Sequence, residues 1–246
     1  MLEKVENKDL EKIRYLFKDI RFHMGNSVLE GNMGEAYADN VLDPKFAILI
    51  VRKYCFMSGN IEKEELEKLI DNKLKQYIII PSDNLKEMIE ETFKDSINKL
   101  ERYSIKKNPI FDKQKLQEYI DKAPKEYPIQ QIDKKLAERI REEEFILITD
   151  DYEKNGVGYC CIYNDEIIGA ASSNIFYKDG IEVNVKVKED YRRKGLATAL
   201  AASLILKCLE ENKTISWDAA NLFSVGLAEK LGFKYDSTYN IYKFNV

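Results

Sequence analysis

The chain has 246 residues, of which 44% are hydrophobic, so it can bury the core of one large domain or of two modest ones. A formal net charge of −4 excludes nucleic-acid binding by bulk electrostatics, and any basic site must be local. One histidine, and four cysteines without a CxxC spacing, predict reduced thiols and no metal site. The sequence has no apolar run long enough to cross a membrane, so no membrane partner is expected. The expected location is the cytoplasm.

Helices and strands alternate through the first half of the chain. Apolar residues at helical spacing predict helices over 8–19, 62–75, 85–94 and 111–123. Asp9 and Asp112 are the expected N-caps of the first and last of these, and Ser82 and Asp83 cap the third. Apolar runs predict a strand or hairpin at 46–60, a strand at 76–84 and a strand at 100–108, and the glycine-rich segment 25–40 is expected to be a turn. The first half is therefore expected to be a small α+β domain.

Two prolines, Pro124 and Pro128, fall in the short polar stretch 122–130. Such a stretch is the best candidate for a domain boundary in this chain. We therefore expect an N-terminal domain at 1–124, shaping the site of an acceptor substrate, and a second domain at 125–246.

The second half begins with a predicted helix and a group of strands. A helix is expected at 132–143, a hairpin of strands at 156–163 and 166–180, and a third strand at 181–190. After these, the pattern predicts a helix from 195 to about 212, a short strand at 214–219, a helix at 222–232 ended by Gly232, and a closing pair of strands or one long bent strand at 233–244. The result is a mixed, mostly antiparallel sheet with flanking helices.

The third strand alternates strictly. Its apolar residues, Ile181, Val183, Val185 and Val187, are expected on one face, and its polar residues, Glu182, Asn184, Lys186 and Lys188, on the other.

Directly after this strand, DYRRKGLATALAAS (190–203) places three cations against the start of a small-residue helix. Cations there are unfavourable by about 0.3–1 kcal/mol each, because the helix dipole is positive at that end. Gly195 lets a ligand approach the backbone closely, and the N–H groups of residues 193–198 can point outward. The spacing Arg192-x-x-Gly195-x-Ala197 therefore predicts a cradle for an anion, typically a phosphate.

Two segments, EVNVKVKEDYRRKGLATAL and WDAANLFSVGLAEKLGF, resemble the motifs of the GNAT superfamily, the GCN5-related N-acetyltransferases. The resemblance covers about 127–246 and is closest to the zwittermicin-resistance-like branch. It implies a C-terminal GNAT fold, preceded by a degenerate GNAT-like half, and acetyl-CoA as co-substrate. Residues that match the family's coenzyme-binding positions are Val185, Lys186, Val187, Arg192, Arg193, Lys194, Gly195, Leu196, Ala197, Thr198, Asn221 and Ser224.

The resemblance also implies catalytic roles. Glu182 is the expected general base, provided that partial burial raises the pKa of its carboxyl group. Backbone N–H groups near Val185–Val187 are expected to polarise the thioester carbonyl. Many GNAT enzymes carry a tyrosine that protonates the leaving thiolate, and here that position is Ala228. Ser224 is a candidate hydrogen-bond donor to the sulfur, with Tyr235, Tyr239 and water as alternatives.

Residues around the last helix, and Glu182 on the third strand, have structural interpretations beside the functional ones. Asn221 can hold the pantetheine arm or cap the helix, and Ser224 can be a donor or a small packing residue. Trp217 is expected in the core, and Asp218 could orient a cationic acceptor. Glu182 could equally be a solvated or salt-bridged strand residue.

Two functions follow from these features. The first is an N-acetyltransferase that moves the acetyl group of acetyl-CoA to a primary amine of a small molecule in a direct ternary complex. The second is a CoA-binding sensor or scaffold without catalysis, which the missing tyrosine favours. The expected partners are a small-molecule amine and no nucleic acid, and the expected state is a monomer or a homodimer.

Overall fold

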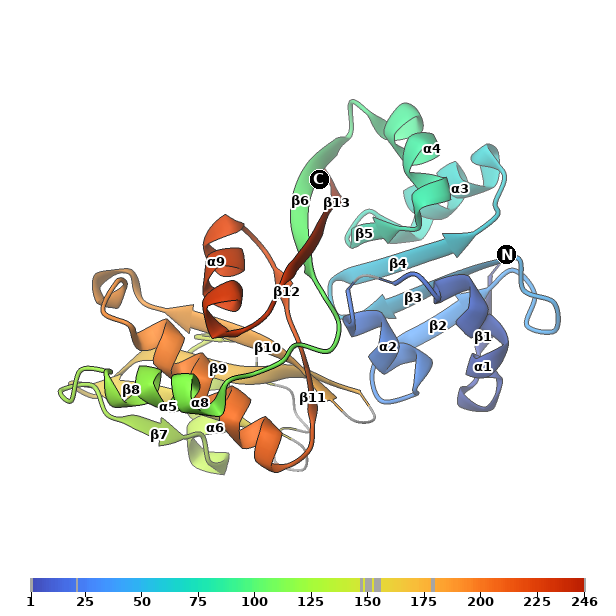
Figure 1. The fold of residues 1–246 in the computed structure, drawn as a ribbon. Coiled ribbons are helices and arrows are strands. Elements are labelled where there is room, and N and C mark those ends of the chain that lie inside the picture. Colours follow the sequence, from blue (N-terminus) through green and yellow to red (C-terminus); the bar gives the residue numbers. More distant parts are fainter. Residues whose placement is uncertain are drawn as a thin grey trace. The chain divides into compact units, whose positions relative to one another are not determined.

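The computed structural model describes residues 2–20, 22–146, 148, 152, 156–177 and 180–245, apart from the side chain of residue 174. The chain divides into two compact units (Figure 1). Unit 1 comprises Met1–Arg102 and Thr238–Val246, and unit 2 comprises Tyr103–Ser237. These limits differ from the division after residue 124 that the prolines suggested. The assignment of acceptor binding to residues 1–124 stays a prediction.

Unit 1 is an α+β unit built on a five-strand ladder. Strands β1 to β4 pair antiparallel in sequence order, and β4 pairs with β5 in parallel. Tyr242 of β13 then lies opposite Ile79 of β5 in an antiparallel register. The elements of this part of the chain are β1 (Glu3–Val5), α1 (Leu10–Ile13), α2 (Met24–Leu29), β2 (Glu35–Ala38), β3 (Phe46–Val51), β4 (Tyr54–Gly59), α3 (Lys63–Leu69), β5 (Ile78–Pro81), α4 (Asp83–Phe93) and β6 (Ile97–Ile105), with 3₁₀ turns at Asn7–Asp9 and Arg14–Phe17 and a π-helical turn at Ile70–Leu74.

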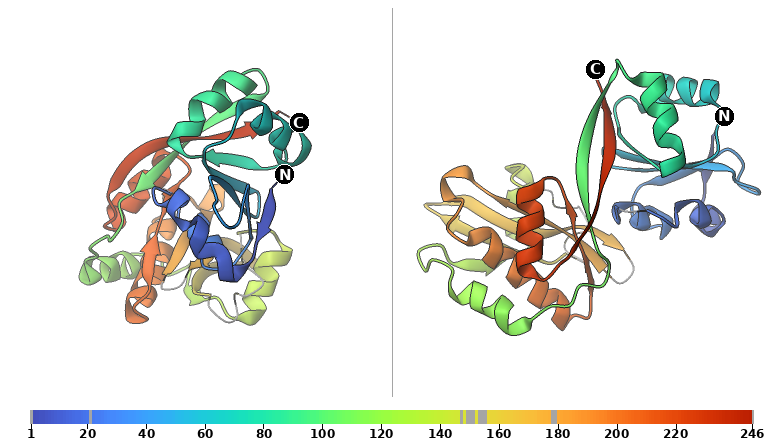
Figure 2. Two further views of the ribbon diagram at one scale, coloured as in Figure 1. Left: turned by 90° about the vertical axis from the view of Figure 1, so that its right-hand side faces the viewer. Right: turned by 45° about the horizontal axis from the view of Figure 1, so that its top comes forward.

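Helices cover both faces of this ladder. Figure 1 and the views in Figure 2 show α1 and α2 on one side of β2–β4 and α3 and α4 on the other. Leu66 of α3, Ile70 of the π-helical turn and Ile89 of α4 pack together with two strand residues, Phe46 and Met57. Burial of such side chains contributes about 1.5–3 kcal/mol each, so the contacts across this core stabilise the unit.

Unit 2 contains a five-stranded sheet in the order β11-β10-β9-β8-β7. Neighbouring strands run antiparallel, except that β10 and β11 are parallel. Its elements are α5 (Lys113–Asp121), β7 (Ile129–Gln131), α6 (Lys134–Glu142), β8 (Gly158–Tyr163), β9 (Glu166–Tyr177), β10 (Gly180–Val187), a 3₁₀ turn (Glu189–Tyr191), α8 (Leu196–Glu210), β11 (Thr214–Ser216), β12 (Asp218–Ala219), α9 (Leu222–Leu231) and β13 (Tyr235–Phe244), which ends in unit 1.

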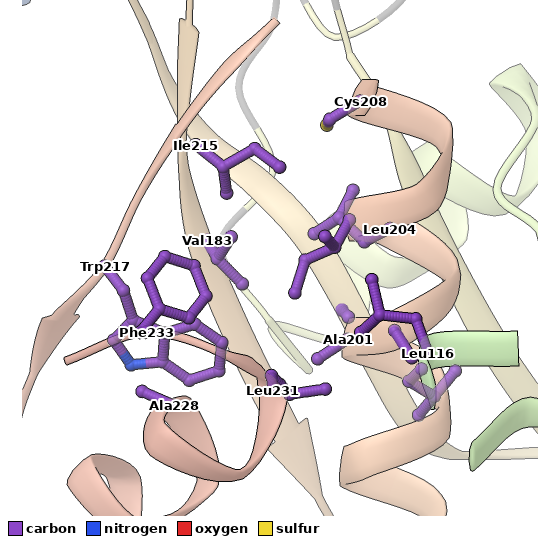
Figure 3. Close-up of a cluster of buried hydrophobic side chains, with 14 of the residues drawn as sticks. Leu116, Val183, Ala201, Leu204, Cys208, Ile215, Trp217, Ala228, Leu231 and Phe233 are labelled. Atoms are coloured by element: carbon purple, nitrogen blue, oxygen red, sulfur yellow. The ribbon is translucent and has the colours of Figure 1, made fainter. Parts of the chain in front are cut away.

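Helix α8 supplies more residues than any other element to the core on one face of this sheet. Its side chains, among them Ala201 and Leu204, point at Val183 and Ile215 of the strands (Figure 3). A separate cluster on other residues of β8 and β9 contains Ile140 of α6. The alternation of β8 and β9 thus serves two cores, one for each face.

Both units repeat one order of elements. Each has a strand, one or more helices, three antiparallel strands, a helix, a strand parallel to the third, and a further helix and strand. Helix α3 in unit 1 therefore corresponds to α8 in unit 2, and the segment before α3 corresponds to the basic turn before α8. The predicted α+β class, with a mostly antiparallel sheet and flanking helices, is confirmed.

Local departures from the sequence predictions have local causes. Segment 25–40 is a turn only in part, because its start belongs to α2 and its end to β2. Asp9 makes no side-chain cap and pairs instead with Lys12 at 2.8 Å, and the predicted Ser82 cap bonds Asn84. The strand predicted at 214–219 breaks at Trp217, and 235–244 is a single strand. Residues 178 and 179 of the predicted strand 166–180 lie outside the described residues.

Candidate active site

Strands β10 and β11 separate at the point where the sequence placed the thioester. Their parallel register runs from Gly180 opposite Thr214 to Glu182 opposite Ser216 and then stops, although β10 continues to Val187. A bulge between Glu182 and Val183 shifts the register against β9 at the same place. The extra residue of this bulge lies on β9, and the bulge falls where the pairing of β10 with β11 ends.

Beyond the bulge, backbone groups on one edge of β10 lack a strand partner. The Lys188 N–H donates to the Ile168 carbonyl at 2.8 Å, and bonding pairs alternate along an antiparallel ladder. Lys186 therefore faces β9, whereas the backbone N–H and C=O groups of Val185 and Val187 face away from it. Among the described strands, none pairs with that edge after Glu182. The strand thus leaves two N–H groups without a strand partner, and their role toward a ligand stays a prediction.

The predicted alternation of β10 is confirmed. Ile181, Val183 and Val187 are buried in the core beneath α8, and Val185 packs against it. Glu182 lies on the opposite face and is only 4% exposed. Lys186 on that same face is exposed, with its ammonium 4.9 Å from the ring centroid of Phe145.

The turn before α8 has the geometry of an anion cradle. Gly195 caps the helix in the left-handed conformation with φ of +84°, and a Cβ added there would meet nothing within 4 Å. The first intrahelical bond runs from the Ala199 N–H to the Gly195 carbonyl, so the N–H groups of residues 196–198 have no partner within the helix. A helix of 15 residues then aligns its dipole with this end.

The three cations of the turn are held differently. The Arg192 side chain stays close to the turn, because its Nε lies 3.4 Å from the Val187 carbonyl oxygen and its guanidinium 3.5 Å from the Glu189 carboxylate. Arg193 is exposed, has φ of +60°, and makes no ion pair or hydrogen bond with any residue that the structure describes. Arg193 is therefore the cation that remains available to an incoming anion.

Lys194 is held by a cluster of three tyrosines, Tyr127, Tyr163 and Tyr191. Its ammonium donates to the Tyr127 hydroxyl at 3.0 Å and lies 5.1 and 5.3 Å from the ring centroids of Tyr127 and Tyr191. The tyrosine rings meet edge to face, with centroids 5.1 to 6.2 Å apart. The hydrogen bond to Tyr127 raises the pKa of Lys194, because it favours the charged form of the side chain.

Three other predicted coenzyme ligands start α8, and they can contribute little through their side chains. Leu196 is buried in the core, Ala197 packs against it, and the buried Thr198 hydroxyl lies 3.4 Å from the Lys230 ammonium. Their contribution to an anion is therefore confined to their backbone N–H groups. Only the folded structure shows that these residues can act through their backbone and not their side chains, because the sequence pattern is the same in both cases.

The start of α9 combines a helix cap with a second hydrogen bond. The Asn221 side-chain oxygen accepts from the Ser224 N–H at 3.0 Å, as an N-cap does. The Ser224 hydroxyl oxygen accepts from the Trp217 indole N–H, also at 3.0 Å. Ala228, the position of the usual tyrosine, has no exposed surface and lies beside the Trp217 and Phe233 rings (Figure 3).

The corresponding turn of unit 1 is unsuited to an anion. Gly59 has φ of +106°, and a Cβ added there would lie 2.1 Å from the Lys45 carbonyl oxygen, so the backbone is covered. Helix α3 has Glu62 as its N-cap residue and carries Glu64 and Glu65 in its first turn. Carboxylates there suit the helix dipole and repel a phosphate.

The described part of the chain contains no group of three or more histidine, cysteine or acidic residues arranged to hold a metal ion. None of its helices combines the length and the apolar character that a membrane crossing requires.

Sequence reasoning missed the residues that position others. Tyr127 lies 67 residues before Lys194, and nothing local in the sequence links them. Trp217 was expected in the core, where it does lie, but its hydrogen bond to Ser224 carried no sequence signal except the spacing of seven residues. The coenzyme and catalytic roles of the residues named from the motifs stay predictions.

Comparisons with known proteins cover nearly the whole chain. A family model described as GNAT acetyltransferase matches residues 14–242. An uncharacterised N-acetyltransferase of Bacillus subtilis, YdfB, is 25% identical over 226 residues, which is 85% of each chain. The crystal structure of a GCN5-related N-acetyltransferase-like protein from Streptococcus suis is 32% identical, with a TM-score of 0.86 over 97% of this chain and 99% of that one. A GNAT-family acetyltransferase from Colwellia psychrerythraea, at 10% identity and a TM-score of 0.50 over 100% of each chain, shares the fold.

Proposed function

The chain belongs to the GNAT acetyltransferase family, and from this premise we propose that it transfers the acetyl group of acetyl-CoA to a primary amine of a small molecule. Both substrates bind together, and the amine attacks the thioester directly. Holding two reactants in one complex removes much of the entropic barrier of a bimolecular step. The resemblance to the zwittermicin-resistance-like branch stays a prediction.

One observation carries the proposal, namely the open turn at Gly195. Its left-handed backbone, the empty space where a Cβ would lie, and the uncapped N–H groups that begin α8 together fit a diphosphate. Arg193 is free to add its charge, and Arg192 lies beside the turn. These groups would hold the coenzyme by its phosphates.

The splayed part of β10 supports the chemical step. The coenzyme supplies an acetyl group that is already activated as a thioester. The N–H groups of Val185 and Val187 would donate to the carbonyl oxygen as negative charge develops there. The proposed base is Glu182, on the opposite face of the same strand and nearly excluded from water at 4% exposure. It would take the proton that the amine loses as the C–N bond forms.

The second candidate, a CoA-binding sensor or scaffold, is favoured by one observation. Ala228 lies in the core, so the helix position that carries a proton-donating tyrosine in many relatives carries no acid here. Both candidates need the anion cradle, and only the enzyme needs Glu182.

Two measurements test the proposal. Calorimetric titration with CoA should show binding, and acetyl-CoA with a panel of small amines should release thiol and yield an acetylated amine identified by mass spectrometry. Binding without any acetylated product across the panel favours the sensor. No binding of CoA at millimolar concentration overturns both candidates.

A further inference from the structure

The hydrogen bond between Trp217 and Ser224 excludes one direction in which the serine hydroxyl could donate. An indole N–H is a donor only, whereas a serine hydroxyl can donate one hydrogen and accept others. With the Trp217 N–H directed at Oγ across 3.0 Å, Ser224 is the acceptor in this bond. Its own hydrogen must therefore point elsewhere.

Both partners of this bond are held in place by further contacts. The Ser224 backbone is fixed by the Asn221 cap at 3.0 Å. The Trp217 ring is 6% exposed and packs against the Phe233 ring, with centroids 5.5 Å apart. Because both are held, the hydroxyl oxygen has a fixed position at the start of α9.

The same indole takes the space that a tyrosine at 228 would need. Residues 224 and 228 are one turn apart on the same face of α9, and side chains on a helix lean toward its N-terminus. A large side chain at 228 would therefore extend toward Ser224 along the path that the Trp217 ring follows (Figure 3). Ala228 has no exposed surface, and this small residue leaves room for the ring.

We propose that Trp217 is a positioning residue that turns Ser224 into the hydrogen-bond donor for the sulfur of the coenzyme. The inference rests on the proposed acetyl transfer. As the C–S bond breaks, its electron pair stays on sulfur, and the Ser224 O–H stabilises that thiolate without giving up its proton. The proton lost by the amine goes to Glu182, and water later protonates the thiolate. Trp217 and Ser224 together replace the tyrosine of other relatives.

Titrating the thiol of bound CoA tests the roles of Trp217 and Ser224 without an acceptor amine. The ultraviolet absorbance of the thiolate, followed against pH in the protein–CoA complex, gives the pKa of the bound thiol. In the unaltered protein it should lie about one unit below the pKa of free CoA, a tenfold change in the equilibrium. Ser224→Ala should abolish that shift, and Ser224→Thr, which keeps a hydroxyl, should retain most of it.

Trp217→Phe keeps an aromatic ring and removes the N–H donor. It should lose the same shift as Ser224→Ala, and the double variant should lose no more than either single variant. Once an acceptor amine is identified, Trp217→Phe and Ser224→Ala should each lower kcat and leave the KM for acetyl-CoA unchanged. As a control, Leu204→Val disturbs the same core from α8 but not the hydrogen bond, and should lower the melting temperature while leaving the thiol titration unchanged.

If Trp217→Phe does not fold, the sulfur isostere of tryptophan, 3-benzothienylalanine, removes the N–H at constant shape. Because Trp217 is the single tryptophan in the chain, its fluorescence reports this environment directly, and its emission should change in Ser224→Ala. A normal thiol titration in either Trp217 variant, or additive losses in the double variant, overturns the inference. Failure of the unaltered protein to bind CoA would instead overturn the proposed function.

Discussion

The Lys194 ammonium donates to the Tyr127 hydroxyl across 3.0 Å, and it lies over the rings of Tyr127 and Tyr191. This lysine thus ties the anion cradle to the start of β7, and it has less freedom to follow a phosphate than its neighbour Arg193. The three adjacent cations of the turn are therefore expected to contribute unequally to coenzyme binding.

The first prediction compares two of these cations. Arg193→Ala should weaken CoA binding about tenfold, close to 1.4 kcal/mol, and should reduce its dependence on salt because one charge contact is lost. Lys194→Ala should weaken binding less and lower the melting temperature more, since it releases the turn from the tyrosine cluster. Calorimetry at low and high salt, with thermal melts, measures both. Equal losses of affinity in the two variants would contradict this division of roles.

The second prediction concerns the open glycine. Gly195→Ala should cost about 1–2 kcal/mol of stability, because alanine is strained at a φ of +84°. Its methyl group would also occupy the cradle and weaken CoA binding by about tenfold or more. Gly226, in the interior of α9, likewise has open space around it and serves as the control. Gly226→Ala should stabilise the protein by about 0.5–1 kcal/mol and leave affinity unchanged. Denaturation and calorimetry of both variants decide the matter.

The third prediction is a stoichiometry. Although the two units share an order of elements, the turn before α3 has a covered Gly59 and an acidic first helical turn. One CoA should therefore bind per chain, and calorimetric titration of a protein solution of known concentration measures the ratio. A ratio near two, with Gly195→Ala removing only half of the binding, would show that unit 1 has a coenzyme site of its own.

The fourth prediction concerns the proposed base. Glu182→Gln keeps the shape of a side chain that is 4% exposed and removes its ability to accept a proton. The turnover number should fall by about 10²–10⁴-fold, with CoA affinity unchanged. The control is Glu166→Gln, because Glu166 is an exposed carboxylate in the same sheet, 3.2 Å from the Lys188 ammonium. It should leave turnover unchanged, and comparable losses in both variants would speak against a specific base.

The fifth prediction concerns the thiols. All four cysteines are buried, and burial raises the pKa of Cys160 to about 11 and those of Cys161 and Cys208 to about 12, from an ordinary value of 9.0. Burial also raises the pKa of Cys55. The native protein should therefore react slowly with an aromatic disulfide reagent at pH 8, and all four thiols should react at once in denaturant. A thiol that reacts rapidly with the reagent in the native protein would show that its cysteine is accessible to solvent.

The sign of the pH dependence follows from the same shifts. Because the native state keeps thiols protonated above the pH at which the unfolded chain ionises, their contribution to stability is complete below about pH 9 and is lost as pH rises toward 11. Denaturant unfolding between pH 8 and 11 should show this decline.

Local patterns predicted much of the site. The alternation of β10 and the turn at Gly195 are each set by neighbouring residues, so sequence reasoning located them. The Asn221 cap was an alternative reading of the motif, and the structure shows that it forms.

Contacts between distant residues could not be predicted in this way. The bond from Lys194 to Tyr127 joins parts of the chain that no periodicity relates, and the same is true of Tyr242 and Glu90, 152 residues apart. The helix at Met24–Leu29 was missed for another reason, because Gly25 and Asn26 have low helix propensity and burial of Met24 and Val28 decides its formation.

The return of the chain to unit 1 at Thr238 governs the order in which the protein can be made. Tyr242 and Phe244, both buried in the core of unit 1, leave the ribosome only after all of unit 2. The first hundred or so residues therefore remain incompletely packed while unit 2 and the last strand are synthesised. This incompletely packed segment is the one that would need a chaperone.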